Sequence, residues 1–112
     1  MNPTTKNFDA YSVAVEMIRA LKPVTTRVQG RDPALATQLR KAAASVPLNI
    51  SEGRRRVGKD RIHHWRIAAG SAAEVRACLD VADAWGYLEP TNVEAALELI
   101  DRILAMLWRL TH

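Results

Sequence analysis

The spacing of apolar residues constrains the fold of this chain more than any other feature. Apolar side chains recur at intervals of three and four along nearly the whole sequence, and no alternating strand pattern lasts long enough to compete. This period predicts four helices, at about 7–29, 32–52, 59–85 and 91–110. Because the links between them are short, successive helices should be antiparallel neighbours. The sequence therefore predicts an all-α fold, an antiparallel up-down-up-down four-helix bundle, formed as one domain over residues 1–112.

Several residues are typical of helix ends. The side chain of Asp32 can cap the second helix, and Pro33 suits its first helical position. Gly30 suits the position that closes the first helix. Thr91 and Glu94 have the spacing of a capping box for the fourth helix. Pro23 lies inside the first apolar stripe, which begins at Phe8, and predicts a bend or a break of the helix there.

Charge and cysteine content narrow the class of protein. The net charge of +4 conceals an asymmetry: residues 1–66 carry 13 Lys/Arg and 5 Asp/Glu (+8), whereas residues 67–112 carry 3 and 7 (−4). A basic and an acidic half can attract polyanions, or attract each other between copies. Cys78 is the only cysteine, and no apolar run approaches the length of a membrane span. We expect a soluble, cytoplasmic protein without a disulfide, a metal site or a cofactor.

Pro47 interrupts the second predicted helix. It has no amide hydrogen, so the carbonyl of Ala43 should lose its helical partner. Asn49 and Ser51 follow among apolar residues, and short polar side chains of this kind bond locally to the backbone. We therefore interpret both as structural, and we expect Gly53 to close the helix in the left-handed conformation.

The stretch that follows, "GRRRVGKD", nearly matches a phosphate-binding loop. Asp60 stands where that loop requires a hydroxyl, and the stretch follows a helix rather than a strand, so we exclude a nucleotide site. Its charge is nevertheless informative. Residues 38–66 contain eight cationic residues and two acidic ones, which gives this stretch a net charge of +6. Such a patch can neutralise phosphates, and we predict nucleic-acid contacts at Arg40, Lys41, Arg54, Arg55, Arg56, Lys59 and Arg61. The alternative is a solvated surface that keeps the protein soluble.

Catalytic constellations are weak in this sequence. His63 and His64 are adjacent, so they point about 100° apart on a helix and cannot share a metal in the usual way. Glu74 lies among small and apolar residues, which suggests a partly buried carboxylate paired with Arg40 or Arg76. We interpret that pair as structural and predict no catalytic residue.

Aromatic residues favour self-association. Trp65, Trp85, Trp108 and Tyr87 exceed what one thin bundle readily covers, and aromatic side chains outside a core tend to mark contacts. The alternative is that each tryptophan lies along a seam between helices.

Two stretches, "LATQLRKAAASVPLNISEG" (35–53) and "IAAGSAAEVRACLDVADAWGYL" (67–88), resemble a known bacterial family. Its members are four-helix bundle proteins first noticed as products of intervening sequences inside large-subunit ribosomal RNA genes. The motifs that carry the resemblance include Pro47, Asn49, Ser51, Glu52, Gly53, Gly70, Ser71 and Glu74, which we assign structural roles.

The resemblance implies a four-helix bundle assembled as a homopentameric ring. It also implies similarity to the accessory variability determinant of diversity-generating retroelements, a basic pentamer that binds a reverse transcriptase and nucleic acid and has no known catalytic activity. The partners to expect are therefore further copies of the chain, nucleic acid (RNA or hybrid duplex), and a reverse transcriptase or other protein. The alternative is an oligomeric protein-interaction scaffold with no nucleic-acid role.

Overall fold

The computed structural model describes the backbone of residues 3–112 and the side chains from Ala10 onward. It contains four helices, α1 (Pro3–Arg31), α2 (Pro33–Arg54), α3 (Gly58–Ala84) and α4 (Pro90–Thr111), and no strand within the described residues. The all-α prediction is confirmed. Phe8, the first residue of the predicted α1 stripe, lies outside the described side chains.

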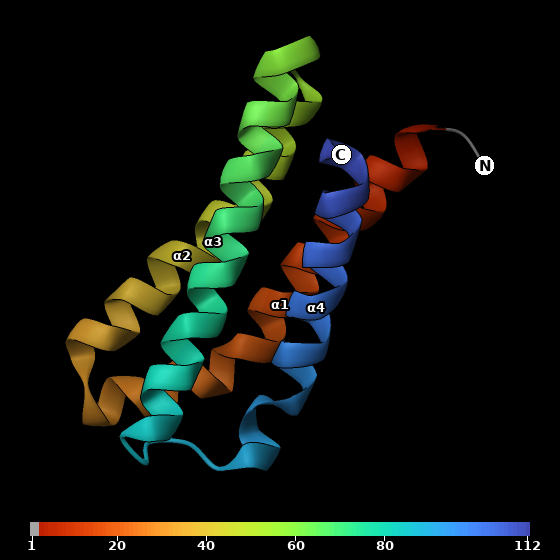
Figure 1. Ribbon diagram of the computed structural model, residues 1–112. Helices are drawn as coiled ribbons and strands as arrows, with labels where there is room; N and C mark the ends of the chain where they lie inside the picture. Colours follow the sequence, from red (N-terminus) through yellow and green to blue (C-terminus); the bar gives the residue numbers. More distant parts are fainter. Residues whose placement is uncertain (1–2) are drawn as a thin grey trace.

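Each helix packs against the helices that precede and follow it in the chain, and α1 also packs against α4. Helices α2 and α3 form a hairpin whose tip projects beyond the C-terminal end of α4 (Figure 1). The molecule measures 42 × 25 × 19 Å.

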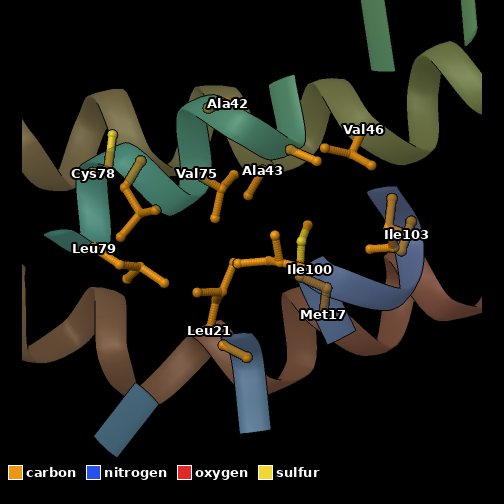
Figure 2. Close-up of a cluster of buried hydrophobic side chains, with 14 of the residues drawn as sticks. Met17, Leu21, Ala42, Ala43, Val46, Val75, Cys78, Leu79, Ile100 and Ile103 are labelled. Carbon is orange, nitrogen blue, oxygen red and sulfur yellow. The ribbon is translucent and has the colours of Figure 1, made fainter. Parts of the chain in front are cut away.

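All four helices contribute side chains to the core. Buried apolar side chains from the four helices form one cluster (Figure 2): Met17 and Leu21 of α1, Val46 of α2, Val75 and Leu79 of α3, and Ile100 and Ile103 of α4. These residues are at most 2% exposed. Because the apolar stripe recurs every three or four residues, each helix turns one continuous side inward.

The start of α2 follows the prediction, whereas the end of α1 does not. The carboxylate of Asp32 accepts a hydrogen bond from the Leu35 amide at 3.1 Å, and Pro33 is the first helical residue. Gly30, in contrast, is an ordinary helical residue without a positive φ. The Asp32 amide donates to the Val28 carbonyl at 2.7 Å, so the helical pattern continues past Gly30.

The predicted capping box of α4 is wrong by two residues. The helix begins at Pro90, and Asn92 reaches back to accept a hydrogen bond from the Glu89 amide at 2.8 Å. Pro90 lacks an amide hydrogen and has a helical φ, which makes it a natural first residue, so the cap moves upstream of Thr91.

Pro23 and Pro47 both lie inside continuous helices. Figure 1 shows α1 bending in the half that contains Pro23, as predicted. Near this proline, the hydroxyls of Thr25 and Thr26 both donate to the Lys22 carbonyl, at 2.9 and 3.0 Å.

Candidate nucleic-acid interface

The tip of the α2–α3 hairpin, residues 52–61, is held together by a tryptophan packed on a glycine. The buried indole of Trp65 lies over Gly53 and donates to the Ile50 carbonyl at 3.2 Å. A Cβ on Gly53 would lie 2.4 Å from the indole nitrogen, so only glycine fits there. The predicted left-handed conformation of Gly53 is wrong: it is a buried residue inside α2 without a positive φ, and close packing explains the glycine.

Arg61 secures the end of α2. Its guanidinium donates to the carbonyls of Gly53 at 3.1 Å and Arg54 at 3.2 Å, and it lies 5.5 Å from the centre of the Trp65 ring. Carbonyls at a helix C-terminus lack helical partners and carry partial negative charge, so a cation suits this place. Arg61, predicted as a nucleic-acid contact, is thus engaged within the hairpin.

The three consecutive arginines have different surroundings. Arg54 is half-buried and lies over the ring of Tyr11 from α1, at 5.5 Å. Arg55 and Arg56 both pair with Glu52, yet their side chains remain 75% and 47% exposed. Lys59 is exposed. Arg55, Arg56 and Lys59 can therefore reach a ligand in solvent.

The pKa of the Glu52 carboxyl is strongly lowered by these two arginines. Hydrogen bonds from Arg55 and then Arg56 lower the pKa of its carboxyl from 4.5 to about 2. Because the charged form is favoured in the folded state, the ion pairs stabilise the hairpin above the unfolded pKa and this contribution disappears as the pH falls from about 4.5 to about 2.

We expect Glu52→Gln to be less stable than the wild type near pH 6, with the difference vanishing by about pH 2 as Glu52 itself becomes protonated. Urea unfolding followed by circular dichroism at several pH values measures this difference. A gap between the two proteins that stays constant from pH 6 to pH 2 would contradict the assigned ion pairs.

The predicted basic patch is divided in space. Arg40 precedes Arg54 by 14 residues, which is about 21 Å along a helix at about 1.5 Å per residue. The tip alone carries five cations (Arg54, Arg55, Arg56, Lys59, Arg61) and two carboxylates (Glu52, Asp60), a net +3 instead of the +6 counted along the sequence. Arg66, also in that count, donates to the Thr111 carbonyl of α4 at 3.2 Å.

Arg40 belongs to a second group of cations that the sequence did not reveal. Its guanidinium donates to the Gln29 side chain at 2.7 Å, and it lines a groove together with Arg19 and Lys22 of α1. Lys41, the next residue, is exposed. Only the packing of α1 on α2 brings Arg19 and Lys22 beside Arg40, so no sequence spacing could have found them.

A chain of polar side chains crosses the seam between α2 and α3. The Ser71 hydroxyl donates to Ser45 at 2.7 Å, and the Asn49 amide donates to the Ser45 carbonyl at 2.9 Å and to its hydroxyl at 3.0 Å. The Asn49 oxygen lies 3.1 Å from Nδ1 of His64, which is the donor because the amide oxygen can only accept.

Pro47 and Ser51 belong to the same part of α2 as Ser45 and Asn49. Pro47 is buried, and the Asn49 side chain bonds to Ser45 rather than to the Ala43 carbonyl that Pro47 leaves free. Ser51 is half-buried and makes no side-chain hydrogen bond among the described residues.

The prediction for Glu74 is wrong. Its side chain is exposed on the outer side of α3, and within the described residues it makes no ion pair. Arg76 pairs with Asp101 of α4 at 2.5 Å, and Arg40 turns toward Gln29. Ala72 and Val75 are the buried residues beside it, and a helix that turns these two inward turns Glu74 outward. Gly70 is also exposed, with nothing within 4 Å of an added Cβ.

The remaining reactive groups do not gather into a site. Within the described residues, no three His, Cys, Asp or Glu side chains are arranged to hold a metal ion. Burial, and then the charge of Glu74, raises the pKa of the Cys78 thiol above its usual 9.0. None of the described helices combines the length and the apolar character that crossing a membrane requires.

We expect Cys78 in the folded protein to react with a disulfide reagent on the order of 100-fold more slowly than in urea, because reaction requires both opening of the core and deprotonation. Stopped-flow absorbance of the released thiolate measures the two rates. Equal rates under native and denaturing conditions would show that this part of α3 is open to solvent.

Comparison with known proteins agrees with this architecture. The chain is similar to a crystal structure of a protein of unknown function from the S23 ribosomal protein family of Bacteroides thetaiotaomicron, with a TM-score of 0.83 at 17% identity. The match covers 95% of this chain and 97% of the other, and at this identity it shows the fold alone. A search of curated proteins finds no match.

The model of a protein family matches nearly the whole chain. Residues 6–109 match the family described as 23S rRNA-intervening sequence protein, which is not a known enzyme family. The resemblance identified in the sequence is confirmed, and the match covers α2 and α3 completely and most of α1 and α4. The chain therefore belongs to the 23S rRNA-intervening sequence protein family.

Proposed function

We propose that this protein is a non-enzymatic, cytoplasmic, oligomeric four-helix bundle protein that binds the backbone of nucleic acid, RNA or hybrid duplex, through the hairpin tip. The observation that carries the proposal is the exposure of Arg55, Arg56 and Lys59 at a projecting end of the molecule. Guanidinium groups bind phosphate oxygens well, and each phosphate neutralised releases condensed counterions. No aromatic side chain from residues 52–61 accompanies these cations, so contacts should be with phosphates and weakly dependent on sequence.

Glu52 does not prevent such binding. It pairs with both arginines, but a carboxylate has only two oxygens, whereas each guanidinium has five donors. Arg55 and Arg56 thus keep free donors on their solvent side. Glu52 holds the two side chains in one place, which lowers the entropy that binding would cost.

Fluorescence anisotropy with a labelled RNA duplex tests the proposal. Charge reversal of both arginines (Arg55→Glu, Arg56→Glu) is expected to weaken binding about tenfold or more near 0.1 M salt and to make the slope of log affinity against log salt shallower by about 2. The matched control, Arg102→Glu with Arg109→Glu, changes the net charge equally at exposed positions of α4. Equal losses from both pairs would mean that binding depends on overall charge, and no loss from the tip pair would refute the site.

The proposal also includes an up-down-up-down bundle and self-association, with a pentameric ring as the assembly that the family resemblance implies. Support for association comes from Trp85 and Trp108, which are 68% and 61% exposed, since large exposed aromatic side chains tend to mark contacts. In such an assembly several tips would act together, and their weak individual affinities for one strand would combine. A reverse transcriptase or another nucleic-acid enzyme is the protein partner that this proposal names.

A scaffold without a nucleic-acid role is the second candidate. The observation in its favour is that Arg54, Arg61 and Arg66 are engaged within the chain. Affinity purification from the host with and without nuclease treatment separates the two. A protein partner retained after nuclease, together with no binding to RNA duplex in the anisotropy experiment, would favour the scaffold.

A further inference from the structure

The outer side of α3 is apolar although it faces solvent. Ile67, Val81 and Trp85 are 37%, 44% and 68% exposed. Between them stand exposed small residues at intervals of three or four, which places the whole set on one side of the helix: Gly70, Ala73, Ala77 and Ala84. We call these seven residues the α3 face. Helices that face solvent usually carry charged residues at such positions, and Glu74 is the charged residue that lies within the α3 face.

A second apolar surface lies between α1 and α2. Leu21 and Ala43 form the floor of a groove of about 340 Å³ between α1 and α2, and Ile18 and Ala44 form its walls. Leu48, 65% exposed, follows Ala44 by one helical turn on α2 and extends the apolar surface. We call this surface the α1–α2 groove.

Cations surround this groove. Arg19, Lys22 and Arg40 line it, and within the described residues Lys22 and Arg40 make no ion pair. Nucleic acid is a poor occupant, since an apolar floor offers nothing to phosphates. An apolar helix that carries carboxylates fits both features of the groove.

The α3 face has the matching properties. Glu74 lies within it and Asp80 lies beside it, both exposed and without an ion pair among the described residues. Its small residues, Gly70 above all, would let another helix approach closely, and no atom of the described residues outside its own helix backbone and chain neighbours lies within 4 Å of a Cβ added at Gly70. The basic groove comes from the half of the chain with a net charge of +8, and the acidic face comes from the half with −4.

From this complementarity we propose that the α3 face of one copy docks in the α1–α2 groove of a second copy. The inference rests on the self-association in the proposed function and names the two surfaces that would form it. Because the two surfaces differ, the contact is head-to-tail and each copy can bind two neighbours, which allows a closed ring. Arg40 then belongs to the subunit contact, with Glu74 of the neighbouring copy as its partner, and only the hairpin tip remains for nucleic acid.

Charge reversal across the contact tests the pairing. Glu74→Arg and Arg40→Glu are each expected to weaken association about tenfold or more, because each places like charges together, and the double variant is expected to recover it. Sedimentation velocity at about 10 µM measures the assembly, with circular dichroism as the check on folding. The matched control is Glu94→Arg, at an exposed position of α4 outside both surfaces, which should associate like the wild type.

Cysteine cross-linking tests the geometry independently of charge. In a Cys78→Ala background, Ala77→Cys places a thiol on the α3 face and Ala44→Cys places one in the groove. Oxidation of the double variant should give a ladder of covalent oligomers, and a mixture of the two single variants should give dimers. Each single variant alone should stay uncross-linked, since a head-to-tail contact does not bring identical positions together.

The outcomes of these experiments distinguish a failure of the docking contact from a failure of the proposed self-association. A wild-type chain that remains monomeric at 10 µM would overturn both the self-association and the docking contact, and would leave the α3 face to a different protein. A stable oligomer that ignores both charge reversals and gives no mixed cross-link would overturn the docking contact alone. Nucleic-acid binding is judged separately, by the Arg55 and Arg56 variants, which should assemble normally.

Discussion

Replacing Trp65 with alanine is expected to lower the free energy of unfolding by about 3–5 kcal/mol, a large part of the stability of a chain this size. Trp65 is 4% exposed, and its indole nitrogen donates to the Ile50 carbonyl across the α2–α3 seam. Its removal leaves a cavity beside Gly53 and leaves that carbonyl without this donor. It also removes the ring over which Arg61 lies, and so loosens the end of α2.

Urea unfolding at a protein concentration low enough to keep the chain monomeric measures this loss, and Trp108→Ala is the matched control. Trp108 is 61% exposed and stacks on His112, so its removal should cost about 0.5 kcal/mol or less. Similar losses from the two substitutions would contradict the assignment of Trp65 as the residue that joins the two helices.

Gly53→Ala should destabilise the protein by about 1–3 kcal/mol, the usual cost of adding a methyl group to a filled core. The added carbon would lie 2.4 Å from Nε1 and 2.5 Å from Cδ1 of Trp65, and 3.2 Å from the Arg61 carbonyl. The indole cannot retreat without losing its hydrogen bond to Ile50, and the Arg61 backbone lies on the other side. The substitution therefore opposes the ordinary preference of helices for alanine over glycine.

Gly30→Ala is expected to change the free energy of unfolding in the opposite direction. Gly30 is an exposed helical residue of α1 with nothing within 4 Å of an added Cβ, so alanine should stabilise the protein by about 0.5–1 kcal/mol. Thermal unfolding of both variants compares the two signs directly. A Gly53→Ala protein as stable as Gly30→Ala would show that the hairpin seam is not packed as described.

The helices and their order could be predicted from the sequence because they depend on local information. The three-to-four spacing of apolar residues places all four helices to within a few residues, and Asp32 with Pro33 marks the start of α2. The sequence predicts the cap of α4 at Thr91, but the cap lies at Glu89. Pro90, whose ring suits the first helical position, moves the start of the helix upstream of Thr91.

The surroundings of the charged residues could not be predicted, because they depend on contacts between helices. Arg61 is one of the eight cations between residues 38 and 66, yet its guanidinium donates to two carbonyls at the end of α2. Glu74 lies among small residues that suggest burial, but three of them, Gly70, Ala73 and Ala77, are exposed and lie with it on the outer side of α3. Gly53 looked like a helix end until Trp65, twelve residues later, was found packed against it.

A salt titration of RNA binding by the wild-type protein tests the central claim most directly. If three or four cations of the hairpin tip neutralise phosphates of a duplex, the slope of log affinity against log salt should be about −3 to −4 per chain engaged. The Arg55→Glu, Arg56→Glu protein should show a slope nearer to zero by about 2. An affinity that does not change with salt, or no binding even at low salt, would contradict the account of the tip as a phosphate-binding surface.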